Sequence, residues 1–143
     1  TLALQNHRPI IDSYQDMLDF IHEVDSPALK ACLDPPLMRE HTEGYYRGAL
    51  EATGDLMVHS HFGGRFERRP DGSVGRWRRN LEGPRSDWPT FLRLARDIVD
   101  FRGHIGYELC SPVLTDHQHE GLDYALSQAQ MACEWMRGLI DAL

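Results

Sequence analysis

The sequence lacks any hydrophobic run long enough to cross a bilayer, and it has no charged segment leading into a short apolar stretch, as a secretion leader would. Cysteine is scarce: the three cysteines of the chain are widely spaced and form no Cys-x-x-Cys pair. We therefore expect reduced thiols in a cytoplasmic protein, rather than a disulfide framework or a zinc knuckle. The glycine-rich turns that bind dinucleotides or phosphates are also missing, which argues against those folds.

Positive charge is also in short supply. The chain has 22 acidic and 15 basic residues, with a formal net charge of −7, so we expect no nucleic-acid partner. The lack of a long apolar run likewise predicts no membrane partner. The content of 41% hydrophobic and 26% charged residues is typical of a globular domain, and 143 residues fit one domain. The chain begins at Thr1 directly before an apolar strand, which predicts that a preceding segment is missing.

Four apolar segments alternate with four amphipathic ones along the chain. The expected strands are residues 2–5, 30–33, 56–61 and 103–109, and the expected helices are 14–24, 40–52, 88–99 and 121–143. Residues 64–87 show no periodicity and are rich in glycine, proline and arginine, so we expect a long loop there. Strict alternation of this kind predicts an α/β fold with a parallel sheet and right-handed crossovers.

Each expected strand ends in a polar residue: Gln5, Asp34, His61 and Glu108. In (β/α)8 barrels the functional groups gather at the carboxyl ends of several strands, whereas a doubly wound sheet concentrates them at one crevice. The pattern therefore favours a parallel (β/α)4 half of a TIM (β/α)8 barrel. Half of a barrel leaves two strand edges open, so we expect the missing N-terminal half-barrel or a second copy of the chain as a partner.

Two carboxylates and one imidazole at these strand ends suit a divalent metal ion. Asp34, His61 and Glu108 favour Mn²⁺ or Mg²⁺, and Zn²⁺ or Co²⁺ also fit the donor set. Such an ion can hold two oxygens of a hydroxy-ketone and acidify the neighbouring C–H bond. Structural roles stay open: Asp34 before two prolines can cap a turn, and His59 and His61, which share one face of a strand, can be core histidines. Glu108 is the strongest signal, because a buried carboxylate needs a cation or donors.

The order of these motifs resembles the sugar phosphate isomerase/epimerase family, the xylose isomerase-like barrels. The segments that carry the resemblance are LALQNH, VDSPALKACLDPP, MVHSHFGGR and GHIGYELCSP, which look like the fifth to eighth strands of the family. The resemblance implies that residues 1–143 are the C-terminal half of such a barrel. It also implies a metal site in which Asp34, His61 and Glu108 are ligands and Gln5 stands in the place of a first glutamate ligand.

The resemblance also implies roles around the metal. Glu108 would act as the acid or base, and Arg65 lies near the place where epimerases use an arginine on substrate oxygens; His7 and His59 are further candidates for substrate contact. Two departures matter: Gln5 replaces a glutamate, and Leu37 stands where epimerases often carry a histidine. Glutamine can offer its amide oxygen to a metal but cannot serve as a base at neutral pH.

The expected function is that of a metal-dependent isomerase or epimerase acting on a sugar, sugar phosphate or related polyol or keto acid. Because Gln5 leaves one acid/base residue fewer, a dehydratase and an inactive, ligand-binding relative remain alternatives. The nuclease branch of the same family is disfavoured by the acidic balance of the chain. The seven arginines of residues 64–87 suggest either an anionic substrate or a solvated surface loop.

Overall fold

The structure is a computed structural model that describes residues 1–76, 86–109, 114–115, 118–119 and 121–143. The chain divides into two compact units. The first contains residues 1–62 and 84–106, and the second contains residues 63–83 and 107–143. The candidate site described below lies in the first unit.

The first unit contains a four-stranded parallel sheet, except for the last residues of its third and fourth strands, which belong to the second unit. Its strands are β1 (Leu2–Gln5), β2 (Leu29–Cys32), β3 (Met57–Gly63) and β6 (His104–Glu108), in the order β1-β2-β3-β6. The pairing of β1 with β2 runs from Leu2↔Leu29 to Gln5↔Cys32. Between β2 and β3 the register shifts at Ala31/Cys32, and Cys32 pairs with His59. Residues 5, 32 and 59 therefore form one row across the sheet.

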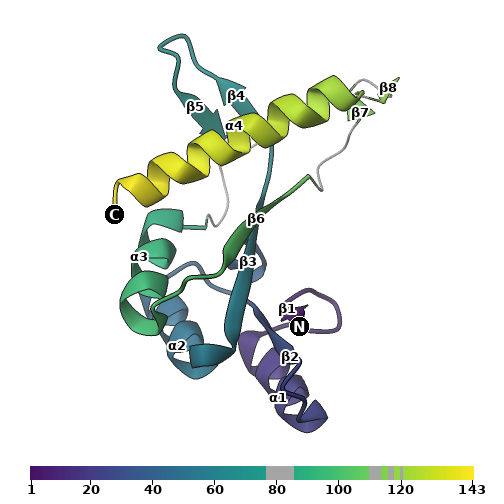
Figure 1. Ribbon diagram of the computed structural model, residues 1–143, viewed down its shortest axis with the longest axis vertical. Coiled ribbons are helices and arrows are strands. Elements are labelled where there is room, and N and C mark those ends of the chain that lie inside the picture. The colour runs from purple at the N-terminus through teal and green to yellow at the C-terminus, as the bar shows by residue number, and fades with distance from the viewer. Residues whose placement is uncertain (77–85, 110–113, 116–117, 120) are drawn as a thin grey trace. The chain divides into compact units, whose positions relative to one another are not determined.

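Three helices connect the strands: α1 (Tyr14–Val24), α2 (Glu43–Thr53) and α3 (Trp88–Val99). The strands lie in the sheet in the same order as in the sequence. Right-handed crossovers that all step the same way across a parallel sheet place every connecting helix on one face of that sheet. Consistent with this, α2 contacts both α1 and α3 (Figure 1). Short 3-10 turns at Pro35–Leu37 and Gly54–Leu56 follow β2 and precede β3.

Each of these helices begins at a side-chain cap. Ser13 Oγ accepts a hydrogen bond from the Asp16 amide, Thr42 Oγ1 from the Tyr45 amide, and an Asp87 carboxylate oxygen from the Thr90 amide. Such caps satisfy amide groups that have no partner within the helix, and they fix where the helix starts. The helix expected from residue 40 therefore begins only after Thr42.

The core of the first unit lies between the helices and the sheet. Its most completely buried side chains are Met17, Leu33, Tyr46, Leu50, Trp88, Phe91 and Leu94. The Trp88 ring meets the rings of Phe62 and Phe91 edge to face, and Phe91 meets Tyr46 in the same way. These contacts anchor the helix layer on the strands, and so hold the strand ends in place.

A glycine permits the close approach of β6 to β3. A Cβ atom at Gly103 would lie 2.2 Å from the Val58 carbonyl oxygen, closer than any side chain tolerates. The residue before β6 must therefore be glycine, and this fixes the start of that strand.

Residues 64–87 were expected to form one long loop, but part of this segment forms regular structure. The second unit contains an antiparallel hairpin of β4 (Phe66–Arg68) and β5 (Val74–Arg76), which packs on α4 (Leu122–Asp141). A tight turn joins the strands, with Gly72 at a φ of 85° and the Gly72 amide donating to the Arg69 carbonyl. The signal was present as Pro70-Asp71-Gly72, but three-residue strands are too short to show a period of two.

Side chains of α4 hold this hairpin. Gln128 donates to the Phe66 carbonyl and accepts from the Phe66 amide, over 3.0 and 2.7 Å. Arg68 pairs with Glu134 at 2.7 Å. The second unit also contains a short antiparallel pair, β7 (Leu114–Thr115) with β8 (Gln118–His119), which the sequence did not predict. Over the residues that the structure describes, no helix is both long and apolar enough to span a membrane.

Candidate metal site

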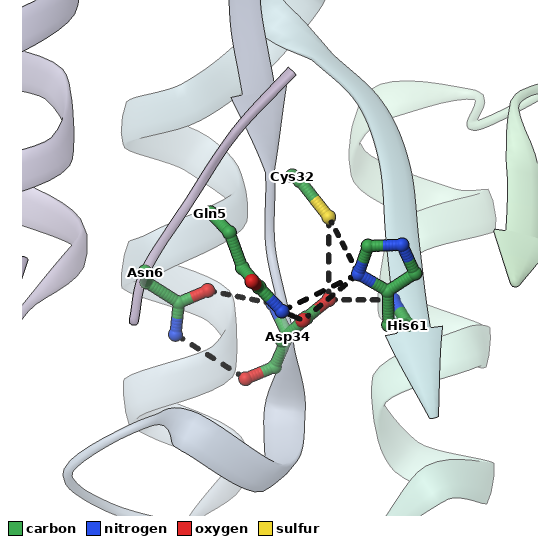
Figure 2. A network of polar contacts seen from close by, with 5 residues as sticks. All are labelled: Gln5, Asn6, Cys32, Asp34 and His61. Carbon is green, nitrogen blue, oxygen red and sulfur yellow. Dashed lines mark hydrogen bonds and ion pairs between the residues drawn. The ribbon is translucent and has the colours of Figure 1, made fainter. Parts of the chain in front are cut away.

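Polar side chains converge where the first three strands end. Gln5 is the last residue of β1, Cys32 is the last residue of β2 with Asp34 two residues beyond it, and His61 lies near the end of β3. Figure 2 shows these side chains, with Asn6, around the Asp34 carboxylate. The structure thus brings together three of the residues singled out in the sequence, Gln5, Asp34 and His61.

Asp34 is the centre of the cluster. Its side chain is only 2% exposed, and its Oδ1 accepts from the His61 backbone amide at 2.5 Å and from the Cys32 thiol at 3.3 Å. Its Oδ2 accepts from the Gln5 side-chain amide and lies 3.3 Å from His61 Nδ1. Among the described residues, the His61 imidazole is the only ionic partner of this carboxylate.

Asn6 holds the backbone of Asp34 in place. The Asn6 carboxamide accepts from the Asp34 amide at 2.7 Å and donates to the Asp34 carbonyl at 3.3 Å, and the Asn6 side chain is buried. This two-point contact ties the end of β1 to the residues that follow β2. The sequence analysis did not single out Asn6, because its role is to position Asp34 rather than to bind a ligand.

The chemistry of the donor set fits a cation. A buried carboxylate is costly unless a positive charge or several donors compensate it, and here the donors are amides, a thiol and an imidazole that carries charge only when protonated. Cys32, Asp34 and His61 each offer one donor atom, and these three atoms lie within 4.8 Å of one another. A divalent ion would supply the missing positive charge between these atoms.

Cys32 is the donor that sequence analysis missed. It is buried, and its Sγ lies 3.5 Å from His61 Nδ1 as well as 3.3 Å from Asp34. A usable signal existed: Cys32 and Asp34 are two residues apart on extended backbone, so their side chains point to the same face. The same rule places His59 beside His61.

The two histidines of β3 pack against each other, and only His61 belongs to the donor cluster. Their ring centroids lie 4.5 Å apart at an interplanar angle of 80°. Burial, helped by the neighbouring His61, lowers the pKa of His59 below its ordinary value, so His59 is neutral at neutral pH. Gly106 of β6 leaves room for both rings, since a Cβ there would lie 3.1 Å from His59 Nε2 and from His61 Cδ2.

Three further residues were singled out in the sequence for the metal site or for substrate contact. His7 is exposed, and its ring nitrogen Nδ1 lies 2.6 Å from the Arg8 carbonyl. Glu108, the last residue of β6, belongs to the second unit, as does Arg65. Within that unit Arg65 donates to the Tyr124 hydroxyl at 2.8 Å, and its guanidinium lies 5.6 Å from the centroid of the same ring.

The arginines of residues 64–87, for which an anion site and a solvated surface loop were both expected alternatives, are in part engaged with the protein. Arg68 pairs with Glu134, and Arg76 donates to the Gly63 carbonyl at 2.8 Å and lies over the Trp135 ring. Arg78, Arg79 and Arg85 lie outside the described residues. The described part of this segment therefore uses several of its arginines for packing.

Comparison with known proteins places the fold. No protein-family model matches the sequence, and no curated protein sequence matches it. Among solved structures, the chain is similar to D-allulose 3-epimerase from Methylomonas sp., with a TM-score of 0.59 and 21% identity over 91% of this chain and 44% of that one. It is also similar to D-psicose 3-epimerase from Clostridium cellulolyticum H10, solved with D-tagatose, with a TM-score of 0.59 and 19% identity over 96% of this chain and 47% of that one. The chain thus has the fold of part of these epimerases and spans less than half of their length.

Proposed function

We propose that residues 1–143 form the C-terminal half of a xylose isomerase-like (β/α)8 barrel, corresponding to its fifth to eighth strands. The parallel sheet with sequential strand order supports this proposal, as does the similarity to less than half of each epimerase chain. Further support is that Gln5, Asp34 and His61 gather at the carboxyl ends of the strands, where barrels carry their functional groups.

We further propose that the complete protein is a metal-dependent isomerase or epimerase acting on a sugar, a sugar phosphate or a related polyol or keto acid. The observation that carries this proposal is the buried Asp34 carboxylate, which is surrounded by uncharged donors and one imidazole. A bound divalent ion would hold two neighbouring oxygens of the sugar and polarise its carbonyl, which acidifies the adjacent C–H bond.

The residues around that ion have different proposed roles. Asp34 and His61 are the proposed ligands, and the His61 amide and Asn6 hold the Asp34 group in a fixed position. Gln5 can offer its amide oxygen to the ion if the carboxamide turns over, since its nitrogen now faces Asp34. Following the resemblance, we assign Glu108 as a further ligand and as the acid or base, and Arg65, His7 and His59 as substrate contacts.

One observation favours a second candidate, a relative that binds metal and ligand without turnover. The Gln5 amide donates to Asp34 at the position where the family carries an acidic ligand, so a carboxylate that could move a proton is absent there. Glu108 would then be the one remaining acid/base residue. A dehydration is a further alternative on the same site, because one residue can take the proton from carbon and give a proton to the hydroxyl that leaves as water.

The test combines metal binding with proton exchange. Calorimetry with Mn²⁺ on the protein should show tight binding that is lost in Asp34→Ala, and incubation with candidate ketoses in deuterated water should incorporate deuterium beside the carbonyl. Binding without deuterium incorporation would favour the inactive relative. Absence of any divalent-metal binding would overturn both forms of the proposal.

A further inference from the structure

A thiol lies between the two side chains proposed to hold the metal. Cys32 Sγ is 3.3 Å from Asp34 Oδ1 and 3.5 Å from His61 Nδ1, and Nδ1 is 3.3 Å from Asp34 Oδ2 (Figure 2). The three side chains come from the ends of two adjacent parallel strands, and Cys32 and Asp34 are almost completely buried. The cluster therefore has one sulfur, one nitrogen and one carboxylate as neighbouring donors.

The spacing of these atoms can be compared with that around a tetrahedral ion. With metal–ligand bonds of about 2.3 Å to sulfur and about 2.0–2.2 Å to nitrogen and oxygen, tetrahedral angles place the donors about 3.4–3.6 Å from one another. The distance of 3.5 Å between Cys32 Sγ and His61 Nδ1 lies in that range. The thiol faces Asp34 Oδ1 and the imidazole faces Asp34 Oδ2, and one donor atom from each of the three residues can be chosen so that all lie within 4.8 Å of one another. A turn of the carboxylate that presents one oxygen to both neighbours would complete the set around one ion.

The charge of the donor set points the same way. Gln5 is neutral, so Asp34 is the one carboxylate among the side chains of this cluster. A thiolate at Cys32 would give the set a second negative charge, and the thiol proton would leave to the solvent as the ion binds. Sulfur is a soft ligand that prefers Zn²⁺, whereas Mg²⁺ takes oxygen ligands almost alone.

We propose that Cys32 is a direct ligand of the ion, and that the site therefore selects thiophilic divalent cations such as Zn²⁺ and Co²⁺ over Mg²⁺. This inference rests on the proposed metal site at Asp34 and His61 and names its third protein ligand. It favours Zn²⁺ and Co²⁺ among the ions that the sequence analysis expected, Mn²⁺, Mg²⁺, Zn²⁺ and Co²⁺, because that expectation considered only oxygen and nitrogen donors.

Co²⁺ is the probe for the first test, because a cobalt–thiolate bond gives an intense near-ultraviolet charge-transfer band. The protein should carry Cys110→Ser and Cys133→Ser, so that Cys32 is its one thiol. We expect the band in this variant and its loss when Cys32→Ser is added. Zn²⁺ affinity should fall at least about tenfold with that change, since even losing a group that only orients a ligand has such an effect. Mn²⁺ affinity should change much less.

X-ray absorption on the zinc form of the Cys32-only variant tests the same bond without changing Cys32. A sulfur scatterer at about 2.3 Å from zinc is expected. A bound ion with oxygen and nitrogen neighbours alone, and no charge-transfer band with Co²⁺, would overturn the Cys32 assignment while leaving the Asp34–His61 site standing. If neither Co²⁺, Zn²⁺ nor Mn²⁺ binds, the metal site and the assignment are both wrong.

Discussion

The backbone amide of His61 donates to the Oδ1 atom of Asp34 at 2.5 Å, so β3 holds the carboxylate through its main chain. The His61 ring approaches the other carboxylate oxygen, at 3.3 Å. His61 therefore has two roles that a mutation can separate. Its backbone amide positions Asp34 and is kept when the side chain is changed, whereas the imidazole is the part of the residue that can bind an ion.

This separation makes the two histidines of β3 a matched pair. We expect His61→Ala to lower the affinity for Zn²⁺ or Mn²⁺ at least about a hundredfold, because it removes a ligand while the amide still holds Asp34. His59→Ala should lower it no more than about tenfold, because His59 packs against the His61 ring without joining the cluster. Calorimetry measures both, and equal losses would show that the ligand has been assigned to the wrong ring.

Gln5→Glu should change stability in opposite directions with and without metal. In the presence of a chelator it places a second carboxylate against the buried Asp34, where the amide now donates, so the free energy of unfolding should fall by about 1–3 kcal/mol. With Zn²⁺ or Mn²⁺ the added charge should raise metal affinity and so restore or exceed the original melting temperature. Thermal unfolding in both conditions measures this.

A control for Gln5→Glu is available on α1. Gln15 is exposed near the start of that helix, so Gln15→Glu makes the same charge change away from the cluster. Its melting temperature should not respond to metal any differently from that of the unchanged protein. A melting temperature of Gln5→Glu that is equally indifferent to metal would contradict a role for residue 5 in the site.

Gly106→Ala should disturb the histidines without touching a proposed ligand. The new Cβ would lie 3.1 Å from both rings, so the imidazoles must shift by a few tenths of an ångström. We expect metal affinity to fall about tenfold, as it does when groups that orient ligands are removed. Gly44→Ala is the control, because a Cβ there meets no atom within 4 Å. Calorimetric titration measures the metal affinity of both variants. An unchanged affinity in Gly106→Ala would show that the positions of the two imidazole rings do not determine how tightly the metal binds.

The C-terminus of α1 offers a test of the fold that is independent of the site. Asp25 adopts a left-handed conformation, with φ and ψ both 45°, and its amide closes the helix on the Ile21 carbonyl. Glycine takes this conformation without strain, so Asp25→Gly should stabilise the protein by about 0.5–1 kcal/mol, and Asp25→Ala should destabilise it by a similar amount. Urea unfolding of the two variants decides the sign, and a loss of stability in Asp25→Gly would mean that the Asp25 side chain contributes more than its backbone costs.

Much of the first unit could be predicted because its signals are local. The apolar runs that end at Gln5 and before Asp34 mark strand ends, and the spacing of Met17, Leu18 and Ile21 marks a helix face. Parallel topology then follows from alternation alone. Gln5, Asp34 and His61 were expected to meet for the same reason, since neighbouring parallel strands bring their carboxyl ends to one edge of the sheet.

What escaped prediction depends on contacts between distant segments. The spacing of Cys32 and Asp34 is visible in the sequence, but the contact of Cys32 with His61 depends on how β2 pairs with β3. Asn6 matters only because its carboxamide reaches the backbone of Asp34, 28 residues away. The hairpin of β4 and β5 is stabilised by α4, through Gln128 and Glu134, rather than by any period of its own.

The last prediction follows from the edge of the sheet at β1. Within the described residues, β1 pairs with β2 on one side only, and Leu2 is 71% exposed. The strand has no lysine or proline to block further pairing, and an unprotected edge of this kind readily adds another strand.

If the chain is half of a barrel, as proposed, residues 1–143 alone should associate into dimers or larger assemblies and show no isomerase activity as a monomer. Ala3→Lys, which places a charge in the middle of β1, should shift the material toward monomers. Size-exclusion chromatography with light scattering measures both, and a stable monomer of the unchanged chain at micromolar concentration, with a cooperative thermal transition, would contradict the half-barrel proposal.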